Sequence, residues 1–147
     1  MSAPSMHSAT QTNPHFEHVA RAPYELGHLL KKMPADFSRV NSITADDRLI
    51  AEAAIDHARN ANDTLMHGLE ALGHLMFVAG TNDNSGIDSS DIASLGYLIS
   101  HIAVESEFLQ ETKWSIREIL DAHDECAAVQ ATKSGDAVSA SKGKNNA

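Results

Sequence analysis

The fold of this chain is decided by residues 44–80, TADDRLIAEAAIDHARNANDTLMHGLEALGHLMFVAG. Apolar side chains recur in this stretch every three or four residues, a spacing that is typical of an amphipathic helix or a coiled coil. The seam that they form consists of Ala54, Ala58, Ala61, Leu65, Leu69, Leu72, Met76 and Ala79. Thr44 and Asp47 are spaced as a capping box, and Gly80 is suited to end a helix. We therefore predict one long helix over Thr44–Ala79.

A second helical stretch, Ser89–Val129, follows the polar loop of residues 80–88. Ser89 or Ser90 is expected to cap it. Its seam runs through Ile92, Leu95, Ile99, Ile102, Ser106, Leu109, Lys113, Ile116 and Leu120. Two long helices joined by a short loop predict an antiparallel hairpin, in which residues whose numbers add up to about 169 lie at one height. Gly73 and Gly96 then meet, and we expect the two backbones to approach closely there.

The rest of the chain is assigned to shorter or irregular segments. Residues 1–15 are polar and without periodicity, and we expect them to be disordered. Residues 16–43 are read as a short helix over 23–32, beginning at Pro23, and a connector whose Phe37, Val40 and Ile43 tuck onto the hairpin. The hairpin domain spans 44–129, and residues 130–147 are expected to be a disordered tail.

The second helix carries more apolar surface than one seam explains. Tyr97, Val104 and Phe108, with His101 among them, form another line beside the seam. A two-helix hairpin cannot bury such a line alone, so either the N-terminal segment or a second copy of the chain must cover it. We predict an all-α protein, a long antiparallel helical hairpin with a short N-terminal helix, which dimerises into a four-helix bundle.

Charge and composition exclude several classes of partner. Residues 44–128 hold 16 acidic side chains and four basic ones, within a total net charge of −9. Direct binding to nucleic acid or to anionic lipid is disfavoured, because both need a basic face. A protein partner, which could be basic, fits better. With a single cysteine and no apolar leader or membrane span, we expect a soluble, cytoplasmic protein.

Histidines and carboxylates suggest metal sites, but their spacing does not support one. His67, Glu70 and His74 lie three and four residues apart on the face opposite the seam, and His101 and Glu105 form a second pair. Di-metal helical bundles project such ligands into their core instead. We expect a solvated polar face, with no metal and no cofactor.

Two further constellations are interpreted as structural. The loop of residues 81–87 faintly resembles a calcium-binding loop, but Thr81 and Ile92 occupy the positions of its essential acidic ligands. His123 and Cys126 are three residues apart, yet Asp124 and Glu125 disfavour a thiolate. No motif of a known enzyme class is found, and we expect no catalytic residues.

An acidic stripe on the second helix, Glu107, Glu111, Glu118 and Glu125, flanks Trp114. An exposed tryptophan among carboxylates is typical of a protein-binding surface, but we favour packing of Trp114 against the first helix near Ile55. The candidate interaction surface consists of Tyr97, His101, Val104, Phe108, Glu107, Glu111, Trp114 and Glu118.

Three functions are consistent with these features. The first is a small acidic, non-enzymatic helical protein that homodimerises and acts through protein–protein interaction, as an adaptor or regulator. The second is an inhibitor from a mobile element whose carboxylates mimic nucleic-acid phosphates. The third is a helix bundle that binds a metal or small ligand through His101 and Glu105.

Overall fold

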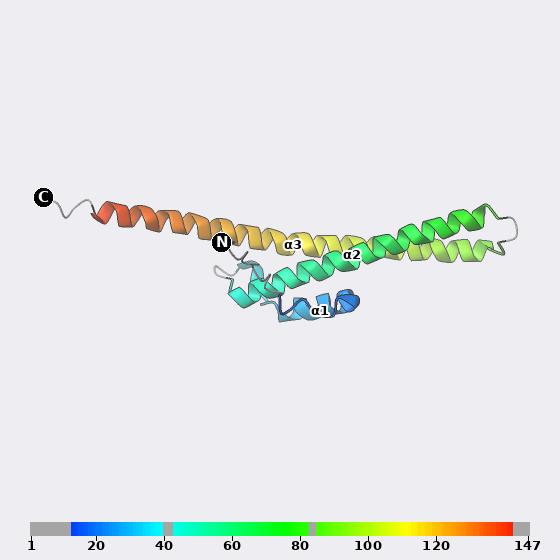
Figure 1. Ribbon diagram of the computed structural model, residues 1–147, viewed down its shortest axis with the longest axis horizontal. Coiled ribbons are helices and arrows are strands. Elements are labelled where there is room, and N and C mark those ends of the chain that lie inside the picture. Colours follow the sequence, from blue (N-terminus) through cyan, green and yellow to red (C-terminus); the bar gives the residue numbers. More distant parts are fainter. Residues whose placement is uncertain (1–12, 40–42, 83–84, 143–147) are drawn as a thin grey trace, which may run out of the picture.

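The computed structural model describes residues 13–39, 43–82 and 85–142, and within these ranges it is all-helical. Its elements are the 3₁₀ turn η1 (Val19–Arg21), helix α1 (Ala22–Lys32), the 3₁₀ turn η2 (Phe37–Arg39) and the long helices α2 (Ala45–Gly80) and α3 (Ser89–Lys142). Helices α2 and α3 run side by side in opposite directions, and α1 lies against the N-terminal part of α2 (Figure 1). The predicted all-α class is confirmed, and the dimeric four-helix bundle stays a prediction.

Local sequence signals explain where the helices begin and end. The Thr44 hydroxyl accepts a hydrogen bond from the Asp47 amide at 3.1 Å, and the Asp47 carboxylate accepts one from the Thr44 amide, so the predicted capping box is present. Helix α1 has Pro23 in its first turn and ends at Lys32, where Met33 adopts the extended conformation that a following proline favours.

The start of α3 differs from the prediction. Asp88, and not Ser89 or Ser90, caps this helix, because its carboxylate accepts hydrogen bonds from the amides of Ser90 at 2.7 Å and Asp91 at 3.0 Å. The Asp91 carboxylate in turn accepts a bond from the Asp88 amide. The bonds to the Asp88 carboxylate favour its charged form and lower the pKa of that carboxyl.

Helix α3 is longer than predicted from the sequence. It continues past Val129 to Lys142, so the tail of residues 130–147, which was predicted to be disordered, is helical as far as Lys142. No proline follows Pro34, and nothing in this segment forces the backbone out of the helix. Of the segment 1–15 that was predicted to be disordered, residues 1–12 lie outside the described residues, as does Val40. The prediction is wrong for residues 13–15, because Asn13 and His15 bond to α2.

One end of the molecule is a three-helix base. Its core joins Leu26 and Leu29 of α1, Ile55 of α2 and Leu109 and Ile116 of α3. Phe37 is buried in this core, and Ile43 packs against it, as predicted. The N-terminal residues are also attached here, because the Asn13 side chain donates to the Leu49 carbonyl at 2.8 Å and His15 pairs with Asp46 at 3.0 Å.

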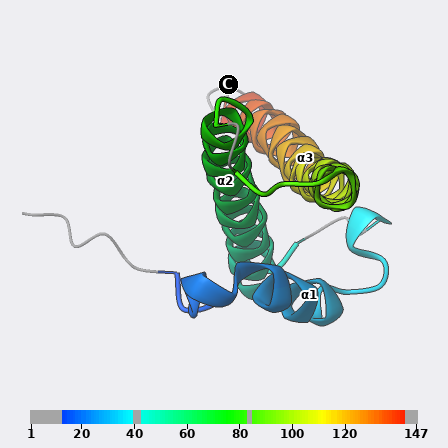
Figure 2. The same ribbon diagram turned by 90° about the vertical axis from the view of Figure 1, so that its right-hand side faces the viewer.

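The other end is a two-helix arm, formed by residues 62–82 and 85–105, that extends from the base without a third layer among the described residues (Figures 1 and 2). The predicted seam positions of α2 in the arm are only half-buried: Leu65, Leu69, Leu72, Met76 and Ala79. On α3 the buried seam is the half that begins at Ser106, whereas Ile92 is 56 % exposed. The described part of the N-terminal segment therefore covers the base and leaves the arm bare.

The predicted hairpin register is confirmed, but not the predicted glycine contact. Ser106 bonds to Asn62 across the two helices, and their numbers add up to 168. At Gly73 and Gly96, however, an added Cβ would meet no atom within 4 Å, so these residues face open space. No described helix combines the length and apolar character needed to cross a membrane.

Candidate interaction surface

The predicted apolar line on α3 is exposed in the structure. Tyr97 is 80 % exposed, Val104 63 % and Phe108 50 %, and His101 is also exposed. These four residues, which we call the α3 stripe, lie at intervals of four, three and four along one side of the helix. A helix normally presents polar side chains to water on such a side.

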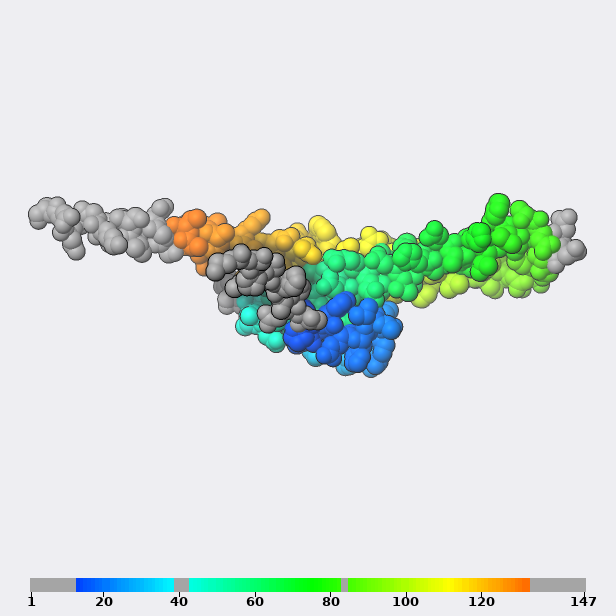
Figure 3. Space-filling view, viewed as in Figure 1, coloured from blue at the N-terminus to red at the C-terminus, as the bar shows by residue number. Residues whose placement is uncertain are grey.

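Helix α2 adds exposed apolar side chains near the tip of the arm. Leu75 is 64 % exposed, Phe77 68 % and Val78 50 %. They lie outside the seam that faces α3, so the pairing of the two helices cannot bury them. The arm is slender in the space-filling view, and its described surface consists of these two helices and the ends of their connection (Figure 3). It therefore exposes apolar side chains from both helices.

The arm also lacks lysine and arginine side chains. Arg59 and Lys113 bracket a span of sequence without any lysine or arginine, and this span includes the whole arm. Between Asp91 and Glu105 the second helix contains no carboxylate either. The part of α3 that lies in the arm thus presents an almost uncharged surface, in contrast to the acidic character of the chain as a whole.

Trp114 is placed differently from the favoured prediction. Its side chain is 65 % exposed, whereas Ile55, against which it was expected to pack, is buried within the base. Glu118 and Glu125 border a shallow hollow of about 340 Å³ beside it. The predicted packing is wrong, since at this height Leu109 and Ile116 of α3 turn toward the base core and Trp114 points outward.

All four carboxylates of the acidic stripe are exposed: Glu107, Glu111, Glu118 and Glu125. None of them forms an ion pair with another described residue. They are accessible to a basic partner. Within the base, by contrast, the Arg48 guanidinium holds Asp124 with two bonds of 2.6 and 2.7 Å and Glu52 with one of 3.2 Å.

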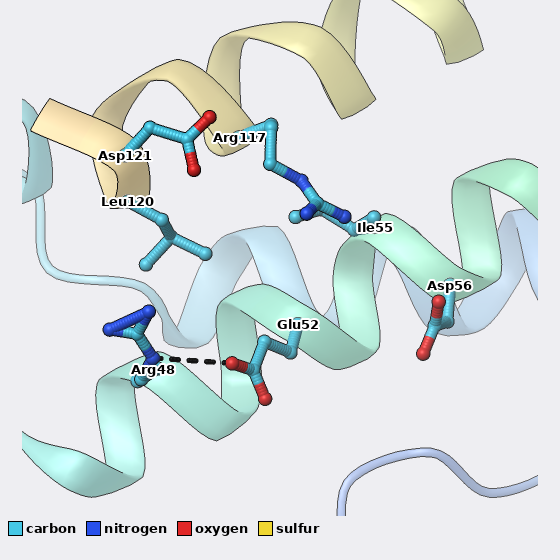
Figure 4. A pocket seen from close by; sticks show the side chains of 7 residues that line it. All are labelled: Arg48, Glu52, Ile55, Asp56, Arg117, Leu120 and Asp121. Carbon is cyan, nitrogen blue, oxygen red and sulfur yellow. Dashed lines mark hydrogen bonds and ion pairs between the residues drawn. The ribbon is translucent and has the colours of Figure 1, made fainter. Parts of the chain in front are cut away.

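A charged hollow between α2 and α3 in the base was not predicted from the sequence. Its volume is about 240 Å³, and Figure 4 shows the charged side chains of Arg48, Glu52, Arg117 and Asp121 around Leu120. The two helices each contribute charges of both signs. Because the hollow depends on how α2 and α3 meet, no spacing within one helix could have revealed it.

The burial of His57 was not predicted either. This residue of α2 is completely buried, and neither ring nitrogen has a hydrogen-bond partner among the described residues. The centroids of the Phe16 and His57 rings are 4.7 Å apart. Burial lowers the pKa of His57 from its ordinary value, while the charges of Glu25 and Asp56 oppose the shift. The one feature of the sequence that could have indicated the burial of His57 is its helical position among the alanines of residues 53–61.

The other histidine constellations are structural or solvated in this fold. His123 Nε2 accepts a hydrogen bond from the Ile43 amide at 3.0 Å, and it thereby attaches the connector to α3. Cys126 is exposed. The side chains that were considered as metal ligands on α2 are exposed as well: His67, Glu70 and His74. Within the part of the chain that the structure describes, no three metal-ligating side chains gather closely enough to hold an ion.

Comparisons with known proteins add no relative. No protein-family model matches the chain, and neither a curated protein nor a solved structure resembles it significantly.

Proposed function

We propose that this chain is a non-enzymatic helical protein that acts through protein–protein interaction, as an adaptor or regulator, and that the arm is its binding element. The observation that carries the proposal is the bare apolar surface of the arm. Tyr97 and Val104 of α3 and Leu75 and Phe77 of α2 are each more than half exposed. Exposed apolar surface of this extent typically marks an interaction site.

The contrast between the two ends of the molecule supports this assignment. In the base, α1 supplies the third element that closes the core through Leu26 and Leu29. Helices bury their apolar faces against a further layer of structure, and the arm has no such layer among the described residues. A binding partner would supply this missing layer. In this proposal the base stabilises the fold, and the arm at the other end of the hairpin binds the partner.

The proposal is tested by changing the arm without changing the base. The arm variant combines Phe77→Glu with Tyr97→Glu, and Val129→Glu is the matched control, because Val129 is an exposed apolar residue of α3 outside the arm. Each protein is cross-linked in extract of its source cells together with an isotope-labelled copy of itself. Cross-linked partners are then quantified by mass spectrometry, and the melting temperature verifies that each variant is folded.

We expect the specific partners of the wild-type protein to be retained by the control and lost from the arm variant. A second copy of the chain counts as a partner in this experiment. Retention of the same partners by a folded arm variant would contradict the proposal, because the arm would then not be the binding element.

A second candidate is a nucleic-acid mimic that inhibits a DNA- or RNA-binding protein. The observation that favours it is the row of exposed carboxylates in the acidic stripe, which have no ion-pair partner within the described residues. Binding of this kind weakens steeply as salt rises, because it depends on Coulomb attraction. The two candidates therefore separate by salt titration: apolar binding through the arm should persist at about 0.5 M salt, whereas mimicry should not.

A further inference from the structure

We infer that the partner of the arm is a second copy of the same chain, and that the two α3 stripes pair antiparallel about a two-fold axis that crosses α3 between Ile102 and Ala103. The arm of each copy then lies along the base part of α3 of the other copy. The inference rests on the proposed function, since it names the occupant of the same surface. Its starting point is the α3 stripe, whose apolar side chains are exposed and therefore unoccupied by α2 or by the base.

The spacing of the stripe is self-complementary. Its intervals of four, three and four residues read the same in both directions, and their midpoint lies between residues 102 and 103. In an antiparallel pair centred there, Tyr97 of one copy reaches the height of Phe108 of the other. Each aromatic side chain then meets its counterpart, and His101 lies near the axis beside Val104. A two-fold interface requires this kind of self-matching surface.

The charge pattern selects the antiparallel arrangement over the parallel one. The C-terminal part of the stripe is accompanied by Glu105, Glu107 and Glu111, whereas residues 92–104 hold no carboxylate. In a parallel pair these glutamates would lie at the same heights as the identical glutamates of the other copy, and neighbouring like charges repel. In the antiparallel pair they come to the heights of uncharged residues, namely Ser100, Leu98 and Ser94.

The same pattern favours a second copy over a charged partner. A strongly basic protein would find no carboxylate between Asp91 and Glu105, a part of α3 that exposes Ile92, Tyr97 and Val104. Two copies bring four aromatic side chains to this region, and at their present exposure these would bury roughly 500 Å². The exposed aliphatic neighbours Ile92 and Val104 add to this area, and specific interfaces begin at about 1,200 Å².

The arrangement is tested with cysteine cross-links in the full chain. All variants carry Cys126→Ser, which removes the exposed native thiol. Tyr97→Cys and Phe108→Cys are made separately, and each protein is oxidised alone and as an equimolar mixture. In the antiparallel pair the two Tyr97 positions are about 16 Å apart along the axis, too far for a disulfide, whereas Tyr97 and Phe108 are at one height.

We expect disulfide-linked dimers in the mixture and not in either protein alone. Efficient cross-linking of Tyr97→Cys by itself would show a parallel pair and would overturn the inference, as would the absence of cross-links in all three samples. Sedimentation of Val104→Glu provides the second measurement, with an expected rise of about 30-fold or more in the dimer dissociation constant. The matched control Val129→Glu should leave this constant unchanged.

The failure of this inference is distinguishable from the failure of the proposed function. A wild-type protein that sediments as a monomer at high micromolar concentration would overturn self-pairing. The proposed interaction function would nevertheless be supported if a different protein bound to the wild-type chain and to the Val129→Glu control, but not to the arm variant.

Discussion

The hydroxyl of Ser106 on α3 donates a hydrogen bond of 2.6 Å to the side-chain oxygen of Asn62 on α2, at the height where the base ends and the arm begins. Ser106 is buried, and Gln110 donates a longer bond of 3.3 Å to the same hydroxyl. A polar pair within a mainly apolar helical seam fixes the register, because any sliding of one helix would leave the two side chains without their hydrogen bond.

Ser106→Ala is expected to lower the free energy of unfolding by about 1 kcal/mol, because the Asn62 oxygen would lose its donor in a half-buried position. Chemical denaturation followed by circular dichroism measures the change. The double variant with Asn62→Ala should cost less than the sum of the two single changes. Strict additivity would show that the two side chains are not coupled.

Gly73→Ala and Gly96→Ala are each expected to stabilise the protein by about 0.5–1 kcal/mol, because glycine weakens a helix interior and the new methyl group meets no atom. Denaturant midpoints measure the gain. Gly86→Ala is the contrasting control, since Gly86 has φ +70° and its replacement should be destabilising by about 1 kcal/mol. A loss of stability at Gly73 or Gly96 would indicate a close backbone contact after all.

Acidification is expected to destabilise the protein through His57. The pKa of His57 is lower than 6.5 in the folded state. At a pH between this lowered pKa and 6.5, the unfolded chain therefore binds a proton that the folded chain does not. The free energy of unfolding should therefore fall as the pH drops through about 6.5. Denaturation curves measured from neutral to mildly acidic pH give this slope.

The His57→Leu variant separates this contribution from the other titrating groups. It should show a shallower loss of stability on acidification than the wild-type protein. His67→Gln changes an exposed histidine of the same helix and serves as the control, with the wild-type slope expected. Equal slopes for His57→Leu and the wild-type protein would refute the role assigned to His57.

Trp114→Ala is expected to change the free energy of unfolding by no more than about 0.5 kcal/mol, because this side chain is largely exposed. A tryptophan packed in the core would instead cost about 3–5 kcal/mol on truncation. The melting temperature distinguishes the two cases. A large loss would restore the expectation that Trp114 packs against α2.

The helical seams could be predicted from the sequence because they depend on the geometry of one helix. The half-buried positions of α2 in the arm are the predicted ones apart from Asn62, and Thr44 forms the predicted cap. Features that depend on how elements meet could not be predicted in this way. Trp114 is the neighbour of Lys113, a predicted seam residue, and periodicity alone does not decide whether α2 packs against Trp114.

The same limit applies to the candidate site. The exposure of the α3 stripe could be predicted from the sequence pattern, because the stripe lies beside the seam that faces α2 and a two-helix hairpin cannot bury it. Which end of the hairpin α1 covers could not be predicted, since that choice depends on the fit of Leu26 and Leu29 against Ile55 in three dimensions. His57 was missed for the same reason, because its burial requires the segment around Phe16 to fold over it.

The unequal lengths of α2 and α3, 36 and 54 residues, divide α3 into zones of different local stability. One stretch of α3 packs in the three-helix base, another pairs only with α2, and the last runs on past the start of α2 (Figure 1). Backbone amides exchange with solvent according to the local cost of opening. Amide exchange along this single helix should therefore be slowest in the base, faster in the arm and fastest in the overhang, and occupation of the arm would slow exchange in the second zone.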